Sequence, residues 1–197
     1  MQLPLTSRRA WRSALALTVV LAALTLAPTA SPARPPVPHP TSSPPTRVEV
    51  ALTRRIERYL DSRGSPMTGI LGFVRDSHAL GVNPVAVIAI SEVESSLGKA
   101  ACRGTKIATG LGACFRAWTQ ITLCGKRYSL RDVHTWRQGL TFTARLIRCL
   151  WPSAATVYSL HGYCSGCSAW GGAVASVMAR MGSGSGVRWR DAREAVR

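Results

Sequence analysis

The stretch that decides the fold is GVNPVAVIAISEVESSLG, residues 81–98. Asn83 followed by proline is typical of a helix start, because asparagine caps a helix and proline suits its first position. Six consecutive apolar residues follow, Val85 to Ile90, and they make the helix apolar on every side. Such a surface predicts a central, buried helix that is closed by Gly98.

Other apolar residues recur at helical spacing on both sides of this stretch. Before residue 81 they predict one helix that stops near Arg63-Gly64 and a second that starts at Ser65-Pro66 and ends at Leu80. After residue 98 they predict a helix from a Ser129 cap to Leu150, a short helix from Ser153 to Leu160, and a helix from Trp170 to Met181. Residues 99–128 contain four glycines and show little periodicity. The predicted fold class is therefore all-α, with one glycine-rich insertion that disulfides pin in place.

The chain divides into four segments by composition. Residues 1–30 predict an export signal, because three arginines precede an apolar run, Ala14 to Leu26, that is shorter than the roughly 20 residues of a membrane span. The alternative is a retained anchor. Residues 31–46 are proline-rich and predict an extended linker. The folded domain is expected over 47–182, and a flexible basic tail over 183–197.

The charge balance favours an anionic partner. The chain has 25 Lys and Arg against 9 Asp and Glu, a formal net charge of +16. Export directs this charge toward an anionic cell-wall polymer, and nucleic acid is disfavoured because no recognisable nucleic-acid-binding module is present. We expect a secreted, wall-associated monomer that meets a membrane only through its N-terminal signal.

Six cysteines lie within the expected domain, at positions Cys102, Cys114, Cys124, Cys149, Cys164 and Cys167. In an oxidising compartment they predict up to three disulfides, with fifteen possible connectivities. Pairing of nearest neighbours (102 with 114, 124 with 149, 164 with 167) is one tidy arrangement. Zinc is the rival interpretation of the Cys164–Cys167 spacing, but no second such pair accompanies it, so we expect no metal and no cofactor.

Two carboxylates, Glu92 and Glu94, stand in the last turn of the central helix. Burial and the negative end of the helix dipole both disfavour a charged carboxylate in such a place, and this favours a proton donor. Glycosidic bond cleavage needs a donor on the bridging oxygen. Because the two residues are two positions apart, they point to different sides, and only one of them can serve a given cleft. The alternative is a solvated carboxylate paired with Lys99 or Arg103.

Residues 81–98 resemble the catalytic helix of lysozyme-like cell-wall glycosidases. The resemblance is to the mannosyl-glycoprotein endo-β-N-acetylglucosaminidase-like group, and to the lytic transglycosylases and goose-type lysozymes, and it extends over about residues 47–181. It implies a lysozyme-like fold with Glu94 as the catalytic glutamate. It also implies a sugar-binding region whose residues are Ser95, Ser96, Thr109, Gly110, Gly112, Tyr158 and Tyr163. Either tyrosine could be the one that such enzymes carry near the cleft. The asparagine-containing turn that often follows the catalytic helix is absent here.

The scarcity of acids bears on the mechanism. Only Asp76, Glu92 and Asp132 are candidates for a second carboxylate, which favours a single-glutamate scheme like that of lytic transglycosylases. His78, His134 and His161 could supply polar cleft groups. The leading hypothesis is an exported enzyme that cleaves the glycan strand of peptidoglycan, as a lytic transglycosylase, a muramidase or an N-acetylglucosaminidase. The alternative is a non-catalytic, cationic wall-binding protein on the same scaffold.

Overall fold

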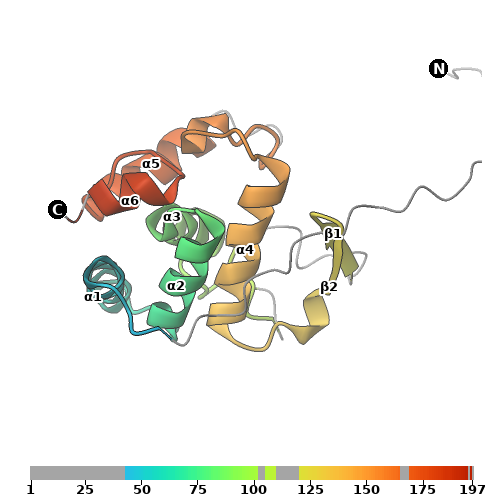
Figure 1. Cartoon of the computed structure of the whole chain (residues 1–197), viewed down its shortest axis with the longest axis horizontal. Coiled ribbons are helices and arrows are strands. Elements are labelled where there is room, and N and C mark those ends of the chain that lie inside the picture. Colours follow the sequence, from blue (N-terminus) through green and yellow to red (C-terminus); the bar gives the residue numbers. More distant parts are fainter. Residues whose placement is uncertain (1–42, 102–104, 110–119, 165–168, 195, 197) are drawn as a thin grey trace, which may run out of the picture. The chain divides into compact units, whose positions relative to one another are not determined.

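The protein is described by a computed structural model that covers residues 43–101, 105–109, 120–164, 169–194 and 196. This part of the chain is mostly helical, as predicted, and Figure 1 shows its arrangement. Its α-helices are α1 (Arg47–Ser62), α2 (Ile70–Leu80), α3 (Pro84–Ser95), α4 (Trp136–Leu150), α5 (Trp170–Arg180) and α6 (Trp189–Glu194). Two short 3-10 helices, η1 (Leu130–Asp132) and η2 (Val157–Ser159), and two strands, β1 (Gln120–Leu123) and β2 (Lys126–Ser129), complete it.

Helix α3 is the centre of the core, as its sequence predicts. Asn83 caps it by accepting a 2.9 Å hydrogen bond from the Val85 backbone nitrogen, and every residue from Pro84 to Ser91 is buried. Helix α5 makes its largest interface, and α2, α4 and α6 pack on other sides (Figure 1). Burial of a helix on all sides removes apolar surface from water along its whole length, so α3 organises the domain.

Helix α2 begins later than predicted. The sequence places its start at Ser65-Pro66, whereas the helix begins at Ile70, after a left-handed Gly69 with φ 74°. The reason is the hydroxyl of Ser65, which donates to the Leu97 carbonyl at 3.0 Å and accepts from the Met67 nitrogen at 3.2 Å. These bonds tie residues 65–67 to the turn after α3 and keep them out of the helix.

The start of α4 also differs from the prediction. Thr135, rather than Ser129, caps it in a reciprocal pair with Gln138, and Leu130–Asp132 form the short helix η1 instead. The short helix expected over 153–160 is reduced to η2, whereas α5 lies where the sequence predicts it.

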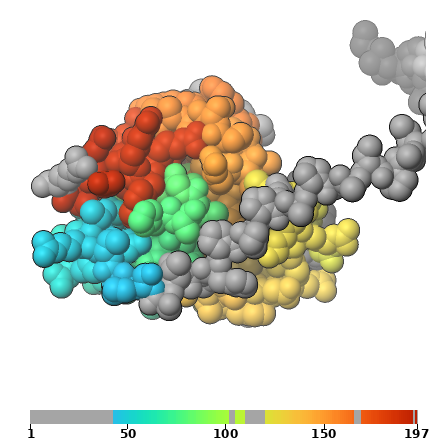
Figure 2. All heavy atoms as spheres, viewed as in Figure 1, coloured from blue at the N-terminus to red at the C-terminus, as the bar shows by residue number. Residues whose placement is uncertain are grey.

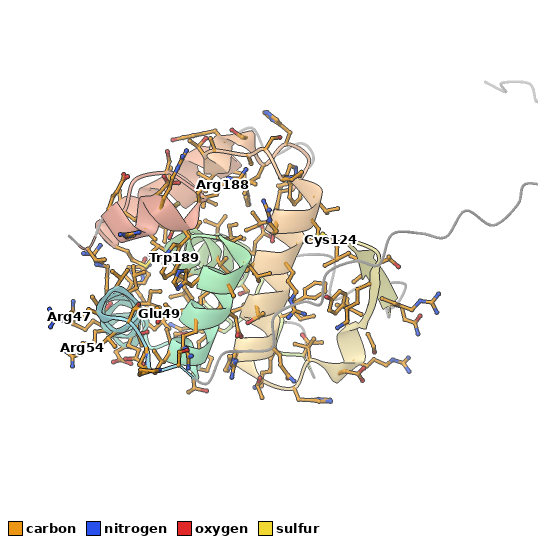
Figure 3. All side chains as sticks on the ribbon, in the orientation of Figure 1. Arg47, Glu49, Arg54, Cys124, Arg188 and Trp189 are labelled. Carbon is orange, nitrogen blue, oxygen red and sulfur yellow. A yellow bond between two sulfur atoms is a disulfide. The ribbon has the colours of Figure 1, made fainter. Side chains whose placement is uncertain are left out.

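A β-hairpin corrects the all-α prediction within the glycine-rich insertion. Strands β1 and β2 pair antiparallel, with Leu123 opposite Lys126, so Cys124 and Gly125 form a two-residue turn. Both turn residues have positive φ, 48° and 77°, as a tight hairpin of this kind requires. The Cys124–Cys149 disulfide fastens this turn to α4, which confirms one predicted pair (Figure 3). Cys164 is also disulfide-bonded, and Cys102, Cys114 and Cys167 lie outside the described residues.

The segment after Gly182 packs on the domain, in contrast to the expected flexible tail. Val187 and Ala192 are buried, and the Asn83 backbone nitrogen donates to the Val187 carbonyl at 2.9 Å. The Asn83 side chain also donates to the Gly186 carbonyl at 2.8 Å, and α6 follows, contacting α3 and stacking its first residue, Trp189, on His78 of α2 (Figure 3 labels Trp189). The residue that caps α3 thus also holds this segment. No helix among the described residues has the length and apolar character that crossing a membrane requires.

Candidate active site

Glu94 lies in the last turn of α3, where α3 meets the start of α5. Its carboxylate is partly buried and accepts a 2.6 Å hydrogen bond from the indole Nε1 of Trp170. Among the described residues no cation forms an ion pair with it, so the expected alternative pairing with Lys99 is not seen. Lys99 instead donates to the Arg63 carbonyl, and Arg103 lies outside the described residues. Glu94 is therefore a carboxylate with one neutral donor and no neutralising charge in this part of the chain.

An aromatic cluster lies beside this carboxylate. The ring of Tyr163 stacks on Trp170 with 4.8 Å between centroids and an angle of 21°, and Trp151 packs at 5.6 Å from Tyr163. The Tyr163 hydroxyl oxygen is buried and makes no hydrogen bond of regular geometry. Burial raises the pKa of this phenol above its ordinary range, and the charge of Glu94 adds to the increase, while a contact with Thr109 opposes it. The phenol thus remains neutral near Glu94.

The two candidate tyrosines therefore differ in position. Tyr163 belongs to the cluster around Glu94, whereas Tyr158 lies on η2 with 57% of its surface exposed. The Tyr158 ring instead covers Gly171, where an added Cβ atom would meet Tyr158 Cδ1 at 3.0 Å. The sequence left the choice between them open, and their contacts now separate them.

Thr109 reaches the same region through a close approach to α4. Its hydroxyl pairs with that of Thr143 at 2.5 Å, and both residues are buried. The approach depends on Gly139, because a Cβ atom there would lie 1.9 Å from the Lys106 carbonyl oxygen. Thr109 lies at the edge of the cluster around Glu94 through its contact with the Tyr163 side chain, while Gly110 and Gly112 lie outside the described residues.

The turn after Glu94 is held by its own backbone and by Ser95. The Ser95 hydroxyl donates to the Ser91 carbonyl at 3.0 Å and accepts from the Gly98 nitrogen at 2.9 Å. Ser96, Leu97 and Gly98 all have positive φ, 49°, 59° and 83°. Ser95 is buried in this turn and Ser96 is exposed. The Glu-Ser-Ser-x-Gly pattern therefore has a structural role here, because it reverses the chain directly after the carboxylate.

Glu92 has the opposite environment to Glu94. Its carboxylate accepts hydrogen bonds from the Tyr59 hydroxyl, from Arg63 at 2.6 Å and from Arg180 at 3.0 Å. Burial alone would raise the pKa of Glu92, but the Tyr59 hydrogen bond and the two guanidinium groups lower it below its ordinary value. Glu92 is consequently a stable anion in a network that joins α1, α3 and α5.

Among the described residues, the other polar candidates make no hydrogen bond or ion pair with Glu94. Asp76 accepts two 2.9 Å bonds from Arg137 and one of 2.8 Å from Thr141, and Asp132 is exposed on η1. His78 pairs with Glu49 at 2.8 Å and stacks on Trp189. His134 and His161 are exposed. Within the described ranges, no group of three His, Cys, Asp or Glu residues could hold a metal ion.

Two contributors to this site were missed by sequence reasoning. Trp170 reads as one member of an apolar stripe, yet its indole nitrogen contacts Glu94. Thr143 reads as a polar residue within a core helix, yet it holds Thr109. A helical repeat shows that both face inward, but it does not say which partner they meet.

Comparison with known proteins gave no match to any protein family, curated protein or solved structure.

Proposed function

We propose that this protein is an exported glycosidase of lysozyme-like type that cleaves the glycan strand of peptidoglycan with Glu94 as general acid. The observation that carries the proposal is the contrast between the two carboxylates of the α3 terminus. Glu92 is held as an anion by three donors, whereas Glu94 accepts one neutral N–H and has an aromatic cluster beside it. A general acid has to take up and release a proton, and among the described residues Glu94 is the one of the two carboxylates without a cation to fix it as an anion.

The positions of the other acids favour a single-glutamate scheme. Asp76 is engaged by Arg137 and Thr141, Glu92 by its network, and Asp132 lies across α4 from the Thr109–Thr143 pair. None of them contacts the cluster around Glu94, as a nucleophile or a water-activating base would need to do. Glu94 would protonate the bridging oxygen and then, as a base, accept the proton of the muramoyl 6-hydroxyl as that oxygen closes an anhydro ring.

The neighbouring groups have defined roles in this scheme. Trp170 would orient the Glu94 carboxylate through its N–H, and the buried Tyr163 phenol would remain a neutral neighbour of that carboxylate. Because both groups are neutral, they would not lock the glutamate in its charged state. The net positive charge of the chain would favour its retention on an anionic wall.

The proposal is tested by Glu94→Gln, with Glu57→Gln on the exposed face of α1 as the matched control. Release of soluble muropeptides from purified cell walls should fall by about 10²- to 10⁴-fold in the first variant and remain unchanged in the second. Circular dichroism and thermal unfolding should match the parent protein in both. Anhydro ends in the products would identify a transglycosylase, and reducing ends a hydrolase. Full activity of folded Glu94→Gln would refute the assignment.

A further inference from the structure

A groove lies between the hairpin, α2 and α4. This groove has a volume of about 880 Å³, and its wall combines β2, the segment after it and one side of α4. Figure 2 shows the hairpin and the following segment, in yellow, together on the visible face. Glu94, Trp170 and Tyr163 are not among its lining residues.

The groove opens on the opposite side of α4 from the Glu94 cluster. Gly139 and Thr143 face the segment that carries Thr109, whereas Gln138, Thr141 and Arg145 line the groove. At about 100° per residue, these two sets point in opposite directions from the helix axis. A ligand in the groove would therefore be separated from Glu94 by the body of α4.

The charges of the groove are predominantly positive. Its lining includes Lys126, Arg127, Arg137 and Arg145, against only Asp76 and Asp132. Asp76 is paired with Arg137. No ion pair with a described residue neutralises the other three cations. Their field favours an anionic ligand.

Two of these cations contact the side chain of Tyr128. Lys126 Nζ and Arg145 Cζ each lie 5.5 Å from the centroid of its ring, and Arg145 also donates to its hydroxyl at 3.3 Å. The ring packs edge to face with Phe142, with 6.0 Å between centroids, and so rests on a small apolar cluster that also contains Leu123 and Leu146. Two cations are thus held at defined positions on one wall.

The remaining wall groups suit a ligand with many hydroxyls. Thr68 and Ser129 can donate and accept, the amide nitrogen of Gln138 can donate, and the exposed Asp132 can only accept while it is ionised. A carboxylate among cations would repel an unbroken phosphate chain, but it accepts hydrogen bonds from sugar hydroxyls. We propose that this groove binds an acidic oligosaccharide, whose sugar hydroxyls meet the polar wall and whose carboxylate or phosphate substituents meet Lys126, Arg127 and Arg145. This site goes beyond the proposed cleavage and does not depend on it.

The test measures binding of the full chain to end-labelled ligands by fluorescence anisotropy. The probes are an oligogalacturonate, which carries carboxylates on a sugar chain and should bind, and a poly(glycerol phosphate) of similar length, a phosphate chain without sugar rings that should bind more weakly. The groove variant is Lys126→Gln with Arg145→Gln, and the control of equal charge is Arg54→Gln with Arg58→Gln on the exposed side of α1. The groove variant should weaken binding by about tenfold or more, since each charged contact contributes on that order. The control should change it by less than about threefold, as expected for distant surface charge.

Three results would overturn the proposal. The first is an equal loss of affinity in both double variants. The others are a neutral chitin oligosaccharide, or single-stranded DNA of matched charge, that binds the parent protein as tightly as the oligogalacturonate does. If the groove variant is less stable because the Tyr128 contacts are lost, the charge reversal Arg127→Glu on the exposed face of β2 should weaken binding without disturbing them. Glu94→Gln should bind as the parent does, so failure of the cleavage proposal and failure of this one give different results.

Discussion

The indole nitrogen of Trp170 and the carboxylate of Glu94 are joined by a hydrogen bond of 2.6 Å, from the first turn of α5 to the last turn of α3. The two residues are 76 positions apart in the chain. The bond exists because α3 and α5 form the largest helix interface of the domain, so the packing of the core also sets the direction of the carboxylate. An acid that is oriented by a buried aromatic ring loses little freedom when substrate binds.

Trp170→Phe should separate this hydrogen bond from the aromatic packing. Phenylalanine keeps a ring against Tyr163 but has no N–H, so we expect kcat to fall about tenfold, as for the loss of one hydrogen bond to a charged group, with little change in KM. Steady-state kinetics on soluble muropeptide oligomers would show this. Trp151→Phe, elsewhere in the same cluster, is the control and should leave kcat unaltered. Equal effects of both variants would reduce Trp170 to a packing role.

Gly98→Ala should destabilise the domain through two separate effects. Gly98 has φ 83°, and an added Cβ atom would lie 2.6 Å from the Trp136 ring. We expect a loss of about 2–4 kcal/mol in the free energy of unfolding from strain and overpacking together. Gly81→Ala has a similar φ of 69° with open space around it, so its loss should be about 1 kcal/mol, from strain alone. Urea denaturation of both variants measures the difference, and identical values would show that the Trp136 contact is easily relieved.

Glu92→Gln should lower stability in a pH-dependent way. Because the pKa of Glu92 is below its ordinary value of 4.5 in the folded chain, the ionised group stabilises the native state above pH 4.5, and this contribution is lost as the pH falls through the folded pKa. At pH 7 we expect a loss of about 1–2 kcal/mol, reduced from that of a buried pair because Arg63 and Arg180 are about half exposed. The free energies of unfolding of the parent and the variant should become equal at acidic pH. A constant difference from pH 7 to pH 3 would contradict this.

Removal of the Cys124–Cys149 disulfide should loosen the hairpin first. The bond closes a loop with a sequence separation of 25, so Cys124→Ser with Cys149→Ser should cost about 3 kcal/mol. Native-state hydrogen exchange should show loss of protection in β1 and β2, while α3, which has no contact with this bond, remains protected. Uniform loss across the domain would mean that the hairpin and the helical core unfold together.

Much of the helical part of this protein follows from local sequence. The apolar run of residues 85–90, with Asn83-Pro84 before it, determines a buried α3, because few other arrangements keep such a helix from water. The Trp170 stripe likewise determines α5. The hairpin was harder to predict, because Gly125 suits a tight turn but Cys124 adopts a positive φ that residues other than glycine rarely adopt.

Contacts between distant residues were decided by the tertiary structure alone. The Ser65–Leu97 bond moves the start of α2, and Asn83 holds a C-terminal segment whose composition predicts a flexible tail. The same applies to the candidate site, where the sequence shows two carboxylates at one helix end and only the family resemblance favours Glu94; the residues themselves do not show how the two environments differ. Their environments come from α1 and α5, since Arg63, Tyr59 and Arg180 reach Glu92 while Trp170 reaches Glu94. Sequence periodicity determines which side chains face inward, and only the packing of the helices determines which of them meet.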